Sequence, residues 1–421
     1  NDGNLPPYDS VRVEEYVNSF DPGYAAPKNA AFTIYADGAP APTGFEDYFE
    51  VEPGDSDYIL RFGVQGYRVS EAERKPANLT FVIDVSGSMD MENRLELVKR
   101  SLRLLVNRLD GRDTVAIVVY GTNARPVLRP TSADRKNIIL RAIDRLSAEG
   151  STNAEAGLQL GYRYASQAYR EGAINRLILC SDGVANTGNT DPETILREVE
   201  DYVSQGITMT SIGVGMGNFN DVMMEKLADR GDGSYYYVDT LDEARRVFVD
   251  DLTSILQVIA KDARVQVDFN NEVVESYRLI GYENRAIADD DFRNDNVDAG
   301  ELGAGHSAVA LYAVRLRPGT EGRLATVNLR WQDPDSGEVQ EINGNFNTWE
   351  MANRFEDSSS RYQLAVTVAQ FAEILRESSY TGNTNLNELA HRAGWLADRL
   401  GEDEQVAEFA DLVRRAAELY Y

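Results

Sequence analysis

The middle of the chain alternates short apolar runs with longer stretches in which apolar residues recur at helical spacing. Residues 79–83 form an apolar run of the length expected for a strand that is buried on both faces. Comparable runs follow it at 114–120, 176–180, 207–214 and 234–238. Helical spacing is present between Leu95 and Leu109, and again near 133–147, 153–170, 191–204, 220–229 and 241–258. Strands that alternate with helices predict an α/β fold with a doubly wound, mainly parallel sheet covered by helices on both faces.

The flanks of this region have a period-two pattern instead, which is typical of antiparallel strands with one face in water. Strand-like runs lie upstream at 31–35 and 58–64, and downstream at 263–269, 307–317 and 324–331. In the run 263–269, Val265, Val267 and Phe269 share one face. Because such strands lie on both sides of the centre, we expect a β-sandwich made of two separated segments, with the α/β domain inserted into it.

From about residue 359 the pattern turns helical once more, with three amphipathic stretches that end near the last residues of the chain. These stretches predict a small C-terminal helical region. The expected domains are therefore a flank at 1–76 that contributes strands to the sandwich, the α/β domain at 77–258, the rest of the sandwich at 259–355 and the helical region at 356–421.

Composition limits the classes of partner. The 421 residues carry a formal charge of −27, which repels phosphate backbones and makes nucleic acid an unsuitable partner. No apolar stretch approaches the roughly 18 residues that a transmembrane helix needs. Cys180 is the single cysteine and closes the apolar run 177–180, so it predicts a buried thiol and excludes an intramolecular disulfide.

Oxygen-bearing side chains occur in three predicted loops that should lie at the same edge of the sheet. The strand at 79–83 runs into Asp84-Val85-Ser86-Gly87-Ser88, which places three oxygen ligands on alternate residues. Thr152 lies in a loop directly before a predicted helix, and Asp182 follows the strand at 176–180. Ligands of open parallel sheets bind beyond the carboxyl ends of the strands, so these loops should open on one edge. Two carboxylates and three hydroxyls suit a hard divalent cation such as Mg²⁺, Mn²⁺ or Ca²⁺, and argue against zinc or copper.

This set resembles the metal-ion-dependent adhesion site, or MIDAS, of von Willebrand factor A domains, whose fold is Rossmann-like. The segments 150–153, 181–183 and 212–215 agree with the same family. The resemblance implies that Ser86 and Ser88 coordinate the ion directly, and that Thr152, Asp84 and Asp182 do so directly or through water. It further implies an open position at the ion, which an Asp or Glu carboxylate of a protein partner would fill.

The flanks are similar to a bacterial family of secreted or lipid-anchored A-domain proteins. The segments concerned are 4–7 (NLPP), 11–15 (VRVEE), 280–285 (IGYENR) and 298–306 (DAGELGAGH). Members are often labelled calcium-activated chloride channel-like and end in a domain of unknown function. The label is not to be taken literally here, because no segment can span a bilayer. The resemblance implies an extracytoplasmic location, secreted, periplasmic or on the cell surface, and allows a lipid anchor upstream of Asn1.

Other sites fit the sequence less well. His306 and His391 are the only histidines, and neither is placed as a base for Ser86. No Gly-x-Ser-x-Gly elbow and no phosphate-binding loop is present. The acidic run 289–298 fails the EF-hand spacing, so a solvated loop is favoured over an accessory calcium site. The tyrosines at 235–237 indicate a strand in the core and at the sheet edge rather than a recognition patch.

The sequence thus favours a non-enzymatic module for divalent-metal-dependent protein binding, in adhesion or assembly. One alternative is an intracellular assembly scaffold, because A domains also occur in assembly complexes. Another is a metal-dependent hydrolase, since a bound metal can activate water, although no base for it is recognisable. By analogy with related folds, movement of the helix near 241–258 is a candidate switch, because this helix leads into the strand at 263.

Overall fold

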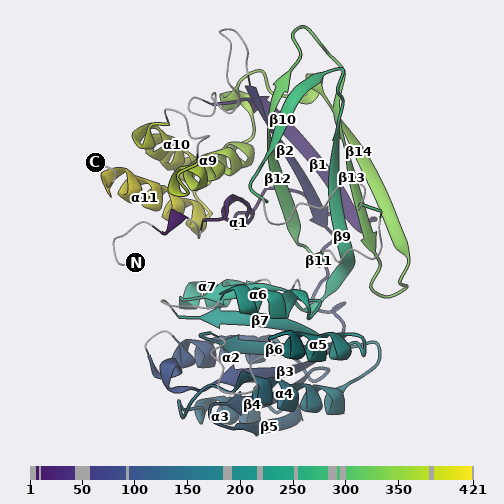
Figure 1. Ribbon diagram of the computed structural model, residues 1–421, viewed down its shortest axis with the longest axis vertical. Coiled ribbons are helices and arrows are strands. Elements are labelled where there is room, and N and C mark those ends of the chain that lie inside the picture. Colours follow the sequence, from purple (N-terminus) through teal and green to yellow (C-terminus); the bar gives the residue numbers. More distant parts are fainter. Residues whose placement is uncertain are drawn as a thin grey trace. The chain divides into compact units, whose positions relative to one another are not determined.

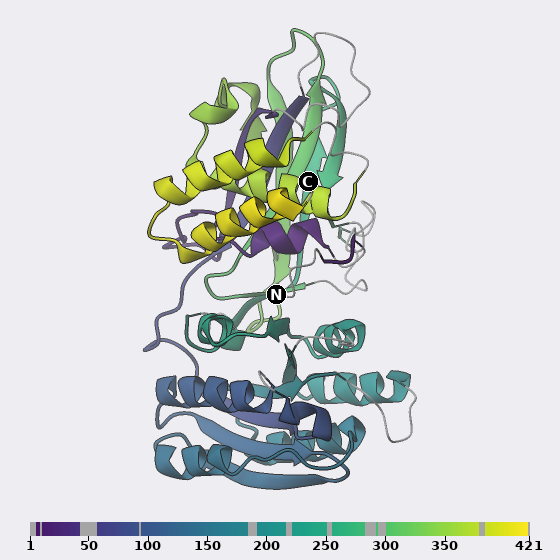
Figure 2. The same ribbon diagram turned by 90° about the vertical axis from the view of Figure 1, so that its left-hand side faces the viewer.

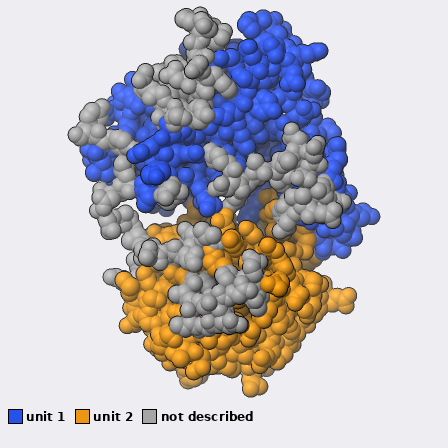
Figure 3. Space-filling view, in the orientation of Figure 1, with its two compact units in different colours: residues 1–68, 262–299, 305–421 blue, residues 69–261, 300–304 orange. Residues whose placement is uncertain are grey.

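The protein forms two compact units, which we name the sandwich unit and the α/β unit (Figure 3). The computed structural model describes residues 6–8, 11–42, 57–91, 94–183, 192–215, 221–250, 255–282, 292–293, 300–378 and 384–419. The α/β unit comprises residues 69–261 and 300–304, and the sandwich unit comprises residues 1–68, 262–299 and 305–421. The sandwich unit is therefore built from separated parts of the chain, as the patterns of the two flanks predict.

The α/β unit is built on a six-stranded sheet in the order β5-β4-β3-β6-β7-β8. All neighbouring strands are parallel except β4 and β5, which are antiparallel. The strands are β3 (Ala77–Asp84), β4 (Thr114–Tyr120), β5 (Ala124–Ser132), β6 (Ile174–Ser181), β7 (Thr208–Val214) and β8 (Tyr235–Val238). The mainly parallel sheet confirms the predicted fold class. Every residue of the central strand β3 is buried, as its continuous apolar run requires.

Helices cover both faces of this sheet. On one face lie α2 (Leu95–Arg108), α3 (Lys136–Asp144) and α7 (Leu241–Arg245). On the other lie α4 (Ala154–Ala168), α5 (Pro192–Val203) and α6 (Asp221–Asp229). Successive residues of β3 serve the two cores in turn, because Phe81 packs in the first and Val82 in the second. Cys180 is buried in the first core, as predicted, and burial raises the pKa of its thiol to about 12.

Near 241–258, where the pattern predicts one helix, the described residues 241–250 and 255–256 are helical but do not form one regular α-helix. After α7 the backbone continues as a π-helical turn, η3 (Arg246–Asp250), and strand β9 begins at Val258. A short 3-10 turn, η2 (Gly87–Asp90), follows β3. Tyr237 lies in the edge strand β8 and is partly exposed, in agreement with the strand predicted there.

Two further sheets, each of four strands, have the orders β1-β2-β12-β10 and β11-β9-β13-β14. Their strands belong to the sandwich unit, except that β11 and the first four residues of β9 belong to the α/β unit. The first consists of β1 (Phe32–Pro40), β2 (Asp57–Gly66), β10 (Val274–Ile280) and β12 (Ser307–Leu316). The second consists of β9 (Val258–Phe269), β11 (Gly300–Gly303), β13 (Arg323–Gln332) and β14 (Val339–Asn347). Strand β12 pairs antiparallel with β2, so residues far apart in the chain complete one sheet, which confirms the predicted sandwich.

Aromatic side chains fill the space between the two sheets. Phe62 of β2 makes edge-to-face contacts with Phe269, Phe346 and Tyr312, with ring centroids 5.8 to 6.2 Å apart. Burial along β9 is uneven: Phe269 is buried, Val265 is 45% exposed, and Ile259 near the start of the strand is buried again. Of the predicted apolar face, Phe269 lies in the core and Val267 packs against it, whereas Val265 is exposed.

Helices pack on the other face of the first sheet. They are α1 (Val13–Asn18), α9 (Ser360–Leu375), α10 (Leu386–Arg399) and α11 (Glu404–Leu419), and the short turns η5 (Thr348–Glu350) and η6 (Phe355–Asp357) precede α9. Figure 1 shows the three C-terminal helices on one side of this sheet and β9, β13 and β14 on the other. Figure 2, turned by 90°, shows α10 and α11 side by side. No helix among the described residues is long and apolar enough to cross a membrane.

Candidate metal centre

Asp84 is the last residue of β3 and is fully buried, although it carries a carboxylate. The Ser86 N–H donates to its Oδ1 at 2.8 Å, and the Ser181 hydroxyl donates to its Oδ2 at 2.9 Å. Burial raises the pKa of Asp84 above its ordinary value, and the hydrogen bonds from Ser86 and Ser181 oppose that shift. Asp84 therefore has both oxygens held in place at the carboxyl end of the central strand.

Ser86 and Ser88 bring two hydroxyls together in the loop that follows. Their Oγ atoms are 3.0 Å apart, within hydrogen-bond distance. Ser86 is buried while Ser88 is exposed, so the pair runs from the interior to the solvent. Asp84, Ser86 and Ser88, three of the predicted ligands, thus lie in one local cluster.

The loop that carries Thr152 packs directly on this cluster. The Gly87 N–H donates to the Gly150 carbonyl at 3.1 Å, and the Asn153 N–H donates to the Gly121 carbonyl at 2.9 Å. Asn153 also caps α4, since its side chain accepts the Ala156 N–H at 3.1 Å. Thr152 is half-buried, and it lies in the chain between Gly150 and Asn153, whose backbone groups form these hydrogen bonds. The backbone therefore places the Thr152 loop against the Asp84 loop.

Asp182 follows β6 and reaches the same cluster through an arginine. The Arg94 Nη1 donates both to the Asp182 carboxylate and to the Ser88 carbonyl, the latter at 3.0 Å. Only 14% of the Arg94 side chain and 8% of the Asp182 side chain are exposed, so the pair is largely shielded from water. Asp182 is also next in sequence to Ser181, which holds Asp84. The carboxyl ends of β3 and β6 thus share one network of polar side chains.

Tyr120, at the end of β4, adds a polar atom to this edge of the sheet. Its hydroxyl is buried, and Ser181 lies beside it. Burial raises the pKa of Tyr120 well above its ordinary value, and the negative charge of Asp84 raises it further. No local pattern indicates that Tyr120 lies beside Asp84, because its side chain completes an apolar strand pattern.

Sequence reasoning assigned no role to Arg94, and it included Ser181 only as part of a segment that agrees with the family. Ser181 could have been noticed as the residue directly before Asp182. Arg94 directly precedes α2 and lies 88 residues from its partner Asp182, so no local pattern indicates their contact.

The donor chemistry of these residues fits a hard divalent cation. No group of three or more His, Cys, Asp or Glu side chains with metal-binding geometry occurs in the part of the chain that the structure describes. An ion held by Asp84 and Asp182 would consequently depend on neutral oxygens for its other ligands. The paired hydroxyls of Ser86 and Ser88 are of that kind. That the five predicted side chains share one ion stays a prediction.

Two other candidates from the sequence lie outside this centre. The acidic run 289–298 falls outside the described residues except for Phe292 and Arg293, and Arg293 forms an ion pair with Glu341 at 2.8 Å. His306 and His391 both belong to the sandwich unit, whereas the centre lies in the α/β unit.

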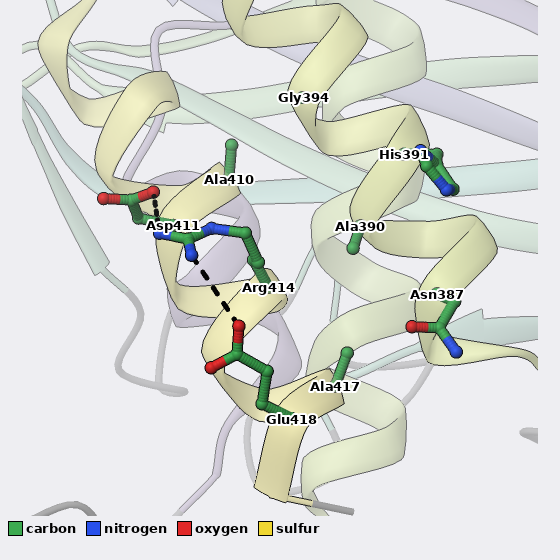
Figure 4. A pocket seen from close by; sticks show the side chains of 9 residues that line it. All are labelled: Asn387, Ala390, His391, Gly394, Ala410, Asp411, Arg414, Ala417 and Glu418. Atoms are coloured by element: carbon green, nitrogen blue, oxygen red, sulfur yellow. Dashed lines mark hydrogen bonds and ion pairs between the residues drawn. The ribbon is translucent and has the colours of Figure 1, made fainter.

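A shallow pocket of about 500 Å³ lies in the sandwich unit, between α10 and α11 (Figure 4). Figure 4 shows Arg414 between two acidic residues of its own helix, Asp411 at 2.9 Å and Glu418 at 3.7 Å. Its lining comprises Asn387, Ala390, His391, Gly394, Ala410, Asp411, Arg414, Ala417 and Glu418. None of the predicted metal ligands takes part in it.

Three sequence families match the chain, in consecutive segments. The family described as von Willebrand factor type A domain matches residues 78–254. The C-terminal family of the uncharacterized protein YfbK matches residues 254–323 and 317–419. A family described as von Willebrand factor matches residues 1–47. Together these matches cover residues 1–47 and 78–419.

Individual proteins are similar to the chain as well. The uncharacterized protein YfbK of Escherichia coli is 35% identical over 99% of this chain and 74% of its own length. Inter-alpha-trypsin inhibitor heavy chain H4 of Homo sapiens is 29% identical over 36% of this chain and 17% of its own length. Among solved structures, a von Willebrand factor type A protein from Catenulispora acidiphila covers 90% of each chain at 17% identity, with a TM-score of 0.47. None of these three carries the chloride-channel label.

Proposed function

We propose a function for this chain on the premise that it belongs to the family of bacterial von Willebrand factor type A proteins that includes YfbK. In this proposal the chain is a non-enzymatic module that binds a protein partner through a divalent metal ion. Asp84, Ser86, Ser88, Thr152 and Asp182 would hold the ion, which is Mg²⁺, or Mn²⁺ or Ca²⁺ in its place. Family members of this fold commonly mediate metal-dependent protein interactions.

The observation that carries this proposal is the pairing of a fully buried carboxylate with two adjacent hydroxyls. Asp84 is held rigidly from both sides, and the Ser86 and Ser88 hydroxyls lie 3.0 Å apart at the rim of the sheet. Neutral hydroxyls contribute ligand oxygens without cancelling the positive charge of a cation. A cation held this way keeps its attraction for a further anionic ligand.

Each residue has a distinct task in such a centre. Asp84 and Asp182 supply negative charge, and the serine hydroxyls and Thr152 supply neutral oxygens. When bound, the ion would supply Lewis acidity and an open position. A carboxylate from an Asp or Glu of the partner is the ligand that suits that position. The rigid anchoring of Asp84 keeps the ligand oxygens ordered before the partner arrives.

The remaining parts of the proposal concern the whole chain. We assign the A domain to 77–258, the sandwich to 1–76 and 259–355 and the helical region to 356–421, and we place the protein outside the cytoplasm. In this arrangement the sandwich and the helices support a domain whose binding edge is the rim at Asp84.

A capture experiment tests the proposal. The full chain is immobilised and incubated with extract from the source organism in Mg²⁺, in EDTA, and as the Asp84→Ala variant in Mg²⁺. We expect one set of proteins to be retained by the wild type in Mg²⁺ and to be lost in the other two conditions. Calorimetric titration with MgCl₂ measures ion binding directly, and Asp84→Ala should abolish it.

A matched control separates loss of the ion from loss of an acidic residue. Asp144 is an exposed carboxylate of the same unit, paired with Arg103. Asp144→Ala should retain both metal and partner. Retention of the same partner in EDTA and by Asp84→Ala would remove the metal from the mechanism.

A further inference from the structure

Arg94 lies beside Asp182 in the candidate metal centre. Its guanidinium binds the Asp182 carboxylate and the Ser88 carbonyl at the same time. Asp182 is one of the proposed ligands, and Ser88 is another. A positive charge of the chain itself therefore lies where the proposed function needs a bound cation.

The fold makes space for this arginine. A Cβ added to Gly215, the first residue after β7, would lie 2.6 Å from Nε and 2.7 Å from Cγ of Arg94. Gly215 has a φ of +89°, which side chains rarely adopt, and its carbonyl accepts the Tyr237 hydroxyl at 2.6 Å. A glycine in this conformation, fixed by a neighbouring strand, gives the side chain of Arg94 a defined place.

The ion pair is also more shielded than most in this unit. Arg103 and Asp144 leave 41% and 50% of their side chains exposed, and Arg125 and Glu149 leave 50% and 53%. The Arg94 and Asp182 side chains are 14% and 8% exposed. Exposed ion pairs contribute little to stability, whereas charges that are shielded from water interact more strongly.

We propose that Arg94 is a resident cation of the metal centre, which competes with the divalent ion for Asp182. This inference rests on the proposed function. While Arg94 holds Asp182, the carboxylate is already neutralised and is a poorer ligand, and a guanidinium beside a divalent ion repels it. Arg94 must release Asp182 for full coordination. The competition lowers metal affinity, so that stable occupancy depends on the additional carboxylate of a partner.

The test compares the full chain with two variants that each remove one positive charge from the same segment. Arg94→Gln removes the resident cation, and Arg103→Gln removes an exposed charge of α2 that is paired with Asp144. In calorimetric titration with MgCl₂, we expect Arg94→Gln to bind about tenfold more tightly than wild type, or about 1.4 kcal/mol. Arg103→Gln should stay within about twofold.

Thermal melting supplies a readout that a structural role would not produce. Without metal, Arg94→Gln leaves a shielded carboxylate without its partner, so its melting temperature in EDTA should fall below that of wild type. In saturating MgCl₂ the difference should disappear, because the ion replaces the lost charge. A deficit of equal size in both conditions would mean that Arg94 only supports the fold and would overturn the inference.

Gly215→Ala tests the same idea with the charge retained. Its methyl group displaces the Arg94 side chain, so this variant should also bind Mg²⁺ more tightly than wild type, and it gives the answer if Arg94→Gln does not fold. Unchanged or weaker affinity for Mg²⁺ in the folded variants would contradict the competition.

Asp84→Ala separates the two proposals. If it binds Mg²⁺ as wild type does, the metal centre itself is wrong; if it does not bind while Arg94→Gln equals wild type, only the role of Arg94 is wrong.

Discussion

Arg61 shows how one buried charge is accommodated by its neighbours. It is 2% exposed, and its guanidinium donates to both oxygens of Asp37, at 2.8 and 2.6 Å. The rings of Tyr24 and Tyr362 lie 5.1 and 5.7 Å from its Cζ. A bidentate carboxylate and two aromatic faces replace the water that this charge loses on burial.

The two tyrosines of this cluster should respond differently to removal of their hydroxyls. The Tyr362 hydroxyl donates to the Ile59 carbonyl at 2.6 Å, whereas the buried Tyr24 hydroxyl has no partner among the described residues. We expect Tyr362→Phe to lower the free energy of unfolding by about 1–2 kcal/mol, and Tyr24→Phe to change it by less than about 0.5 kcal/mol. Urea denaturation measures both, and equal losses would show that the bond to Ile59 contributes nothing.

His306 predicts a pH dependence of the sandwich unit. Burial lowers the pKa of His306 below its ordinary value of 6.5. The unfolded chain therefore binds the proton more readily, so stability is full above about pH 6.5 and is lost as the pH falls toward the lowered pKa. We expect His306→Gln to lose less stability than wild type between pH 7.5 and 5.5. Urea denaturation at several pH values tests this, and parallel curves would contradict it.

Two helical glycines differ in the space around them. A Cβ at Gly161 of α4 would lie 2.2 Å from Cγ2 of Val82, while a Cβ at Gly394 of α10 would meet nothing within 4 Å. Gly161→Ala forces α4 away from β3 and should destabilise the α/β unit by about 1–3 kcal/mol. Gly394→Ala gains helix propensity without a clash and should stabilise its unit by about 0.5–1 kcal/mol. Chemical denaturation of the two variants should therefore shift in opposite directions.

The helices and strands could be predicted from periodicity wherever burial alone determines their pattern. The continuous run before Asp84 predicts β3, and the helical spacing from Leu95 predicts α2, because each element buries a regular face. Strand β5 has no such pattern. It is an edge strand that contains Pro126 and Pro130, and Leu128 is its only buried residue. Its pairing with β4 is a tertiary effect that the local sequence does not encode.

In the candidate site, too, some residues could be predicted from the sequence and others could not. Asp84, Ser86 and Ser88 could be placed together because they share one loop, and Asp182 because parallel strands end at one edge. The partner of Asp182 could not be inferred. Arg94 reaches it only because Gly215, far along the chain, leaves room for its side chain. Contacts of this kind depend on side-chain packing among three chain segments, and no spacing rule describes them.

The chain as a whole contains separate hydrophobic cores. Two of them enclose the parallel sheet of the α/β unit, and two others lie on either side of the first sheet of the sandwich unit. Since each unit buries its own apolar surface, each should unfold as a cooperative body of its own. The candidate metal centre lies wholly within the α/β unit.

This separation leads to a prediction for metal removal. In differential scanning calorimetry we expect two transitions in EDTA, and only one of them should move when Mg²⁺ is added. At about 100 times its dissociation constant the ion should stabilise that transition by about 2.7 kcal/mol, or raise its midpoint by about 5–10 °C. The other transition should stay in place, because the sandwich unit holds none of the proposed ligands.

Variants identify which transition belongs to which unit. Gly161→Ala should lower the metal-sensitive transition, and Tyr362→Phe should lower the other. Asp84→Ala should remove the response to Mg²⁺ while leaving the Tyr362-sensitive transition unchanged. If Mg²⁺ moved both transitions equally and Asp84→Ala did not prevent it, the stabilisation would come from general screening of the net charge of −27 rather than from a site at the rim of the sheet. An equal ionic strength of NaCl distinguishes these cases, since screening needs no particular ion and the proposed oxygen ligands do.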